Sequence, residues 1–269
     1  MNYPIAEYAP LTADTTRGPT ASLWARINWQ LAALDPNRGF HMFQELMDFP
    51  TFVTSGAQLG SWDQIFDSNC TIALDPTTIG GVVKMTTDAT DNQEVYLEWG
   101  AGKGSFMKVQ ASTGPFCFET RVKISSIANA AMDIIMGLTE EGVAAANFID
   151  DGGAMTTVKD LIGWNIKIDD GDSIDAVYAK ASGSLVADTE GAYVPVADTW
   201  MKLGLYYDGV STMYWYVDGV EVASALITAT HFPAAEELVP FYGFKNGGAA
   251  AMSMSIDWFK AAMLLNTSA

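Results

Sequence analysis

The sequence has 269 residues, 49% of them hydrophobic, which is enough for one large domain with its own core. It carries 14 basic and 32 acidic side chains, a net charge of −18 at pH 7. This charge argues against nucleic acid and against anionic membrane surfaces as partners. No run of about 18 apolar residues marks a membrane span, and the start lacks a signal-peptide pattern, so we expect synthesis in a cytoplasm.

The first 19 residues are predicted to form an extended arm, because three prolines separate small polar residues there. Tyr3, Ile5 and Tyr8 are isolated apolar groups within this arm. Such a segment can become ordered on a neighbouring molecule, and apolar side chains of this kind then bury area on the partner.

Two short helical pieces are predicted after the arm. Over residues 20–34, apolar residues recur at helical spacing behind Thr20, a suitable N-cap, and the sequence DPNRG ends the run. Residues 40–49 are expected to form the second piece. From about Gly60 onward, short alternating runs separated by Gly, Asp and Asn indicate an all-β domain.

Residues 200–225 predict three consecutive antiparallel strands. Asp218-Gly219 supplies the positive φ angles of a two-residue type I′ turn, and Asp208-Gly209 marks an earlier corner with a longer loop. Between the corners, apolar and polar residues alternate with the period of two that a strand requires.

Further strands are predicted from Val82, Glu94, Phe116, Met132, Leu161, Ile174 and Met252. In the last of these, Met252, Met254, Ile256 and Trp258 are expected to share one face. Antiparallel strands with a buried face stack as two sheets, so we expect a jelly-roll sandwich over residues 60–262. Residues 1–59 would be the arm and helical segment, and 263–269 a C-terminal tail.

Five of these segments are FCFETRVKI, IIMGLTEE, WMKLGLYYDG, YWYVDGVEVA and MSIDWFKA. They resemble, in this order, strands of the concanavalin A-like lectin and glucanase superfamily, which includes laminin-G-like domains. Within it, DLIGWNIKIDDGDSIDAVYAK followed by ADTWMKLGLYYDG is similar to domains of virion structural proteins of tailed bacteriophages. The resemblance implies an all-β concanavalin A-like jelly roll and a non-enzymatic role.

The phage resemblance further implies a capsid decoration or cement protein, located on the capsid surface of a virion. Its partners would be the major capsid protein and copies of itself, as a homo-oligomer with a trimer favoured. We predict that the apolar residues of the arm and helix make this interface, and these are Tyr3, Ile5, Tyr8, Leu23, Trp24, Ile27 and Trp29. The alternatives are a carbohydrate-binding, lectin-like module and a glucanase.

The glucanase alternative depends on one strand. Retaining glucanases of this superfamily carry Glu-x-Asp-x-Glu, and this sequence has Glu94, Tyr96 and Glu98 in those positions. Tyr96 replaces the central carboxylate, and two exposed glutamates on a polar strand face are a common structural outcome. We therefore predict no catalytic residues.

Carbohydrate binding could use Trp164, Tyr206, Tyr214 and Tyr216, although a large core needs such aromatics too. The four aspartates of residues 169–175 offer a minor alternative, a calcium site, although a hairpin turn explains them as well.

The remaining candidate motifs predict no metal site and no cofactor. GAGKGS at residues 100–105 lacks the spacing of a phosphate loop, and His41 and His231 belong to no nucleophile or zinc pattern. Cys70 and Cys117 are expected to be free thiols.

Overall fold

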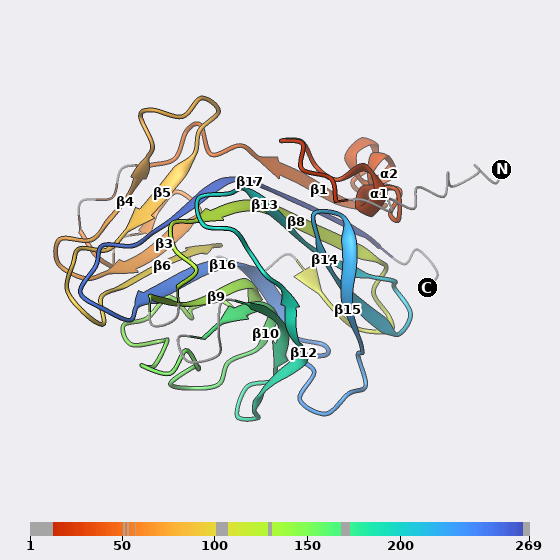
Figure 1. The fold of residues 1–269 in the computed structure, drawn as a ribbon. Helices are drawn as coiled ribbons and strands as arrows, with labels where there is room; N and C mark the ends of the chain where they lie inside the picture. The colour runs from red at the N-terminus through yellow and green to blue at the C-terminus, as the bar shows by residue number, and fades with distance from the viewer. Residues whose placement is uncertain are drawn as a thin grey trace.

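The computed structural model describes residues 13–50, 52, 54–56, 58–100, 107–128, 131–167 and 173–265. The predicted arm contacts of Tyr3, Ile5 and Tyr8 lie outside these residues. Within the described ranges, two antiparallel sheets are stacked face to face, and two short helices lie at the N-terminal side (Figure 1).

Sheet A has eight strands among the described residues, in the order β15-β14-β13-β8-β17-β5-β4, with β1 also paired to β17. Its strands are β1 (Gly39–Gln44), β4 (Thr71–Leu74), β5 (Val83–Thr86), β8 (Phe116–Ile124), β13 (Met201–Tyr207), β14 (Thr212–Val217), β15 (Val220–Leu226) and β17 (Ser253–Leu264).

Sheet B has nine strands in the same part of the chain, in the order β12-β11-β10-β9-β16-β6-β3-β2, with β7 paired to β16. They are β2 (Gln58–Leu59), β3 (Trp62–Phe66), β6 (Glu94–Trp99), β7 (Met107–Lys108), β9 (Met132–Thr139), β10 (Leu161–Ile166), β11 (Ile174–Ala179), β12 (Leu185–Tyr193) and β16 (Glu237–Asn246).

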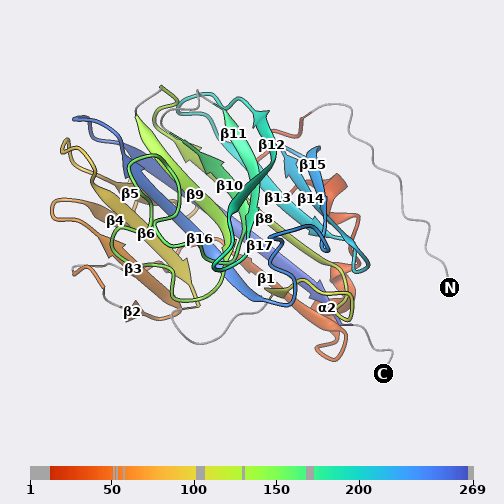
Figure 2. The ribbon, with the colours of Figure 1, turned by 90° about the horizontal axis from the view of Figure 1, so that it is seen from below.

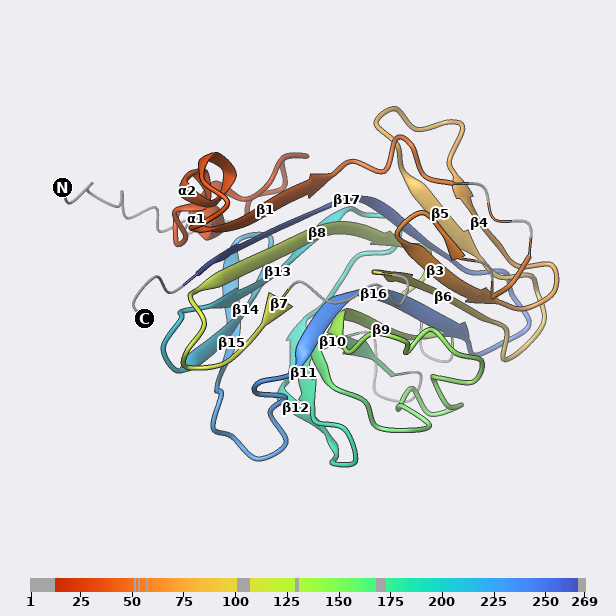
Figure 3. The same ribbon diagram turned by 180° about the vertical axis from the view of Figure 1, so that it is seen from behind.

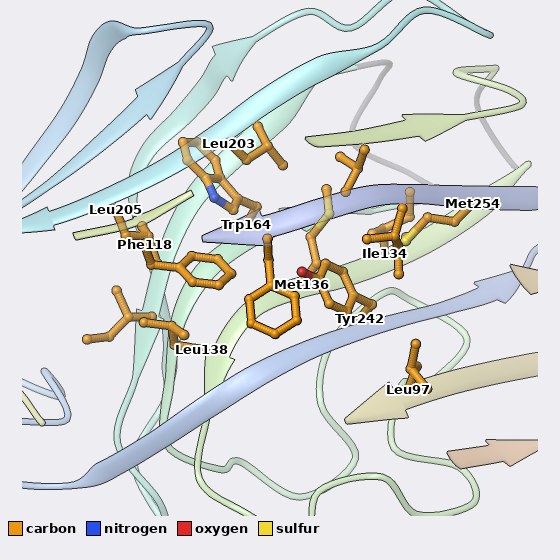
Figure 4. Packing of buried hydrophobic residues seen from close by; sticks show 14 of the residues in the cluster. Leu97, Phe118, Ile134, Met136, Leu138, Trp164, Leu203, Leu205, Tyr242 and Met254 are labelled. Atoms are coloured by element: carbon orange, nitrogen blue, oxygen red, sulfur yellow. The ribbon is translucent and has the colours of Figure 1, made fainter. Parts of the chain in front are cut away.

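The core lies between the sheets, because alternate side chains of each strand point inward. Figure 4 shows Phe118, Leu203 and Leu205 of sheet A beside Trp164 and Leu138 of sheet B. All five are at most 1% exposed. At about 25 cal/mol per Å² of buried apolar surface, this layer is the main driving force for stacking the sheets.

The predicted hairpins are confirmed. Asp218 and Gly219 have φ angles of 48° and 79° and join β14 to β15. At the earlier corner Gly209 has a φ of 77°. The Asp208 carboxylate accepts hydrogen bonds from the backbone N–H groups of residues 210–212.

One face assignment in the last strand is wrong. The pairing of β17 with β8 shifts register between Ile256 and Trp258, which inserts one extra residue into β17. The shift places Phe259 in the inter-sheet core with Met254 and Ile256. Trp258 instead lies against the N-terminal segment, where its indole Nε1 donates to the carbonyl of Arg17 at 2.8 Å.

The helical prediction over residues 20–34 is confirmed only in part. The structure contains α1 (Ala21–Trp24) and α2 (Trp29–Leu34), and Asn28 between them has non-helical backbone angles. Both lie on the side of sheet A that faces away from sheet B (Figure 3). Contacts with the sheet fix the path of this segment. Within the described ranges, no helix is long and apolar enough to cross a membrane.

The prediction of a helix over residues 40–49 is wrong. Residues 39–44 form β1, which pairs along its whole length with β17, from Gly39 opposite Leu264 to Gln44 opposite Phe259. Long-range pairing therefore outweighs the local helical pattern. The predicted boundary at residue 60 is too late, because β1 is already part of sheet A, and β17 continues past residue 262.

Candidate functional site

A pocket of about 330 Å³ opens at the boundary between the two sheets. Sheet A contributes the end of β1, and sheet B contributes β3, β6 and the turn between β2 and β3. The lining residues are Gln44, Asp48, Pro50, Leu59, Gly60, Ser61, Trp62 and Trp99. The volume falls in the range of small-molecule sites.

The aromatic wall of the pocket is built by strand register. Trp62 and Trp99 are direct partners across the antiparallel pair of β3 and β6. Both rings pack edge-on against Phe259 of β17, with centroid distances of 6.0 and 6.2 Å. Phe259 is itself the register partner of Gln44 in β1. The β-bulge in β17 turns the Phe259 ring inward, and the rings of Trp62 and Trp99 pack against it there.

The rim of the pocket is polar. Asp48 and Ser61 are exposed, and the Gln44 side-chain Nε2 donates to Asp48 Oδ1 at 3.4 Å. Gly60 has a φ of 64°, a left-handed conformation that favours glycine and turns the chain between β2 and β3. Trp62 is 5% exposed and Trp99 is half-buried, so Trp99 offers the more accessible ring.

These groups suit a polyhydroxylated ligand with an apolar face. An indole ring packs against C–H groups, while a carboxylate, an amide and a hydroxyl can exchange hydrogen bonds with hydroxyl groups around them. The sequence interpretation missed this pocket. Its residues come from three separate segments, and only the long-range pairing of β3 with β6 brings Trp62 next to Trp99.

The predicted glucanase strand has a different role. Glu98 is fully buried. Its carboxylate accepts hydrogen bonds from the backbone N–H groups of Gly142, Val143 and Ala144, at 2.7, 2.9 and 3.0 Å. Burial raises the pKa of Glu98, while these three hydrogen bonds oppose the rise. The expectation of exposed glutamates is therefore wrong.

Glu94 and Tyr96 hold the same loop further along. Glu94 Oε1 accepts the N–H of Asn147 at 2.6 Å, and the Tyr96 hydroxyl donates to Glu94 Oε2 at 2.7 Å. The Tyr96 hydroxyl also accepts the N–H of Ile149 at 3.0 Å. Figure 2 shows this loop, which follows β9, lying over β16 and β6 on the outer side of sheet B. The Glu-Tyr-Glu set anchors a loop and faces no open cleft.

The aromatic residues proposed for glycan contacts separate into two groups. Trp164 is 1% exposed in the inter-sheet core, and Tyr216 is 2% exposed under the N-terminal segment. Tyr206 and Tyr214 are half-buried and stack on each other at 5.8 Å, with the Arg26 guanidinium 5.8 Å from the Tyr206 ring. Stacking occupies ring faces, so these tyrosines are a weaker ligand surface than the pocket.

Three of the predicted interface residues contact the protein's own sheet. Leu23, Trp24 and Ile27 are 1 to 4% exposed and form a cluster with Cys117, Tyr216 and Ala262. Trp29 is half-buried and, like Trp24, has the Lys260 Nζ 4.0 Å from its ring centroid. Their described contacts are intramolecular, and an interface with another molecule stays a prediction.

The other sequence candidates add no second site in the described part of the chain. No group of three His, Cys, Asp or Glu residues there could hold a metal ion. Of the four aspartates considered for calcium, only Asp175 is described, and it is buried and accepts the N–H of Gly191. The GAGKGS motif lies almost entirely outside the described residues.

The histidines and cysteines have structural surroundings. His41 stacks on Trp29 with ring centroids 4.9 Å apart, and burial lowers the pKa of His41. His231 lies in the loop between β15 and β16. Cys70 and Cys117 are free thiols, as predicted, and both are buried.

The two stacked antiparallel sheets, with this strand order, define the concanavalin A-like jelly-roll fold. Solved structures similar to this chain include the peanut lectin, with a TM-score of 0.52, 14% identity, and coverage of 85% of this chain and 99% of that one. The Emp47p carbohydrate recognition domain has a TM-score of 0.54 and 12% identity, covering 84% and 97%.

A third similar structure is described with endo-acting O-glycanases of the human gut microbiota. It has a TM-score of 0.52 and 11% identity, covering 84% of this chain and 99% of that one. At these identities the likeness concerns the fold alone. The concanavalin A-like prediction is confirmed at that level.

No protein-family model matches the sequence, and no curated protein sequence matches it. The fold is shared by carbohydrate-recognition domains, which agrees with the lectin-like alternative at the level of architecture. Nothing in the comparisons bears on a capsid role, which stays a prediction from the sequence resemblance.

Proposed function

We propose that this protein is a lectin-like module that binds saccharides, without hydrolysing them, in the pocket lined by Trp62 and Trp99. The observation that carries the proposal is the combination in one pocket of a half-buried indole, Trp99, with a polar rim made of the exposed Asp48 and Ser61 and the half-buried Gln44. Saccharide rings present an apolar C–H face and a hydroxyl edge, and this pocket offers a surface for each.

The arrangement of buried carboxylates supports binding without hydrolysis. A glycosidase needs two carboxyl groups on either side of the bond that is cleaved. Among the described residues, the pocket lining contains one carboxylate, Asp48. Glu94 and Glu98 lie on the outer side of sheet B, where their oxygens accept backbone N–H groups of the protein's own loop.

A glycan array followed by titration calorimetry with the strongest hit tests the proposal. We expect saturable binding by the wild-type protein, and about tenfold weaker binding by Asp48→Asn and by Gln44→Ala, since each loses a hydrogen-bonding group. Asp91→Asn is the matched control, because Asp91 is exposed, lies outside the pocket lining and undergoes the same change in charge.

Trp99→Ala should abolish binding, with circular dichroism used to show that the variant is folded. Ser61→Ala gives a second, milder rim variant that leaves the aromatic wall intact. The proposal is overturned if the wild-type protein binds no saccharide, or if the Asp48 and Trp99 variants bind as tightly as the wild type. Release of reducing ends from a polysaccharide panel would contradict the non-hydrolytic part.

A further inference from the structure

We infer that the pocket selects uncharged saccharides and rejects those that carry a carboxylate or sulfate group. This inference rests on the proposed saccharide-binding function and concerns the class of ligand that the same pocket accepts. It follows from the charges on the segments that build the pocket.

The segments around the pocket are acidic. Residues 44–50, 58–66 and 94–100 contain five acidic residues and no Lys, Arg or His. Glu94 and Glu98 bind a loop on the outer side of sheet B, and Glu45 lies 3.4 Å from Arg17, so these three add little to the charge at the pocket. Among the described residues that line the pocket, Asp48 is the ionisable one, and its side chain is exposed at the rim. A ligand bound there meets a carboxylate at hydrogen-bonding range.

Two basic side chains near these strands are engaged elsewhere. Arg17 binds Asp257 at 2.6 Å and lies 3.4 Å from Glu45, so it already neutralises acidic groups of sheet A. Lys260, next to Phe259 in β17, has its Nζ 4.0 Å from the ring centroids of both Trp24 and Trp29, on the outer side of the sheet.

An acidic ligand therefore encounters repulsion without a compensating ion pair in the described lining. Repulsion between two unit charges about 4 Å apart near a protein surface is large enough to weaken binding by about tenfold or more. The net charge of −18 adds a long-range repulsion that salt screens over about 8 Å at physiological ionic strength. A neutral saccharide loses nothing by either effect, and its hydroxyls donate to Asp48.

Matched ligand pairs test the inference by titration calorimetry. The probes are methyl glucoside with methyl glucuronide, methyl galactoside with methyl galacturonide, and lactose with sialyllactose. Each pair is measured in about 0.01 M and about 1 M salt, where the Debye length is about 30 and 3 Å. We expect the neutral member of a binding pair to bind at least about tenfold more tightly in low salt, with a smaller ratio in high salt.

Asp48→Asn should lower this ratio of affinities, and the matched control Asp91→Asn should leave it unchanged. Equal or tighter binding of the anionic members overturns the inference while the saccharide-binding function stands. A ratio unaffected by Asp48→Asn overturns the role of Asp48. Binding of none of these probes and of no saccharide on the array would overturn the function and, with it, the inference.

Discussion

Arg17 and Asp257 are 240 residues apart in the sequence, and their side chains form a two-pronged ion pair on the outer face of sheet A. Arg17 Nη2 lies 2.6 Å from Asp257 Oδ1, and Arg17 Nε lies 3.0 Å from Asp257 Oδ2. Asp257 also binds Arg121 Nη1 at 2.6 Å and is 1% exposed. The N-terminal segment is thus tied to the bulge in the last strand.

Removing the buried partner of this pair should cost more than removing the exposed one. We expect Asp257→Asn to lower the free energy of unfolding by about 3 kcal/mol, because it leaves two guanidinium groups beside a neutral amide. Arg17→Ala should cost about 1 kcal/mol, since the Arg17 side chain is 46% exposed. Urea unfolding measures both, with Arg38→Ala as the surface control. Equal costs for the two changes would contradict this assignment.

Glu119 should make stability depend on pH. Its carboxylate accepts the Thr20 N–H at 2.9 Å and the Trp24 indole at 2.7 Å, and burial raises its pKa. A raised pKa means that the folded state holds the proton more tightly than the unfolded state. Its contribution to the free energy of unfolding is therefore full below about pH 4.5 and is lost as pH rises through the folded-state pKa.

Glu119→Gln removes this titration. The difference in unfolding free energy between wild type and Glu119→Gln should fall as pH rises above about 4.5, as measured by urea unfolding at several pH values. Glu190→Gln, a change at an exposed position of β12, is the matched control. A difference that stays constant with pH would show that Glu119 does not titrate in this way.

Tyr96→Phe should loosen one part of the loop over sheet B. The hydroxyl accepts the Ile149 N–H and donates to Glu94, so its loss leaves buried groups unpaired at a cost of about 1 to 3 kcal/mol. Hydrogen exchange should accelerate at Ile149 and remain slow at Gly142 and Val143, which Glu98 holds independently. Tyr214→Phe, a change at a half-buried position on the outer face of sheet A, is the control. Uniform acceleration across the loop would show that the anchors act as one unit.

The two thiols should react only after unfolding. Cys70 and Cys117 are buried, and burial raises the pKa of Cys70 to about 11 and that of Cys117 well above its ordinary value. Since the thiolate is the reactive form, about one Cys70 side chain in a thousand would be ionised at pH 8. A thiol-reactive dye should therefore label both residues in denaturant and neither in the native protein. Rapid native labelling, or loss of both thiols under non-reducing conditions, would contradict this.

The sequence by itself determined the strands whose side chains alternate clearly, together with two of their turns, whereas β12 and β16 were not predicted from it. The strands predicted from Phe116 and from Met132 begin at those residues in the structure, since a period of two is a local property of a strand. Asp218-Gly219 identified its hairpin because only a few residue types adopt two consecutive positive φ angles. These features depend on neighbours in the chain, which the sequence displays directly.

The tertiary structure alone decided which strand faces are covered and where the pocket lies. Glu119 of β8 is buried because residues 20–24 lie on the outer face of that strand. A single extra residue near Asp257 exchanged the faces of Trp258 and Phe259. Trp62, Trp99 and Gln44 meet only because β3 pairs with β6 and β1 pairs with β17. Such pairings depend on which faces of the sheets are buried, and the residues of a single strand do not predict them.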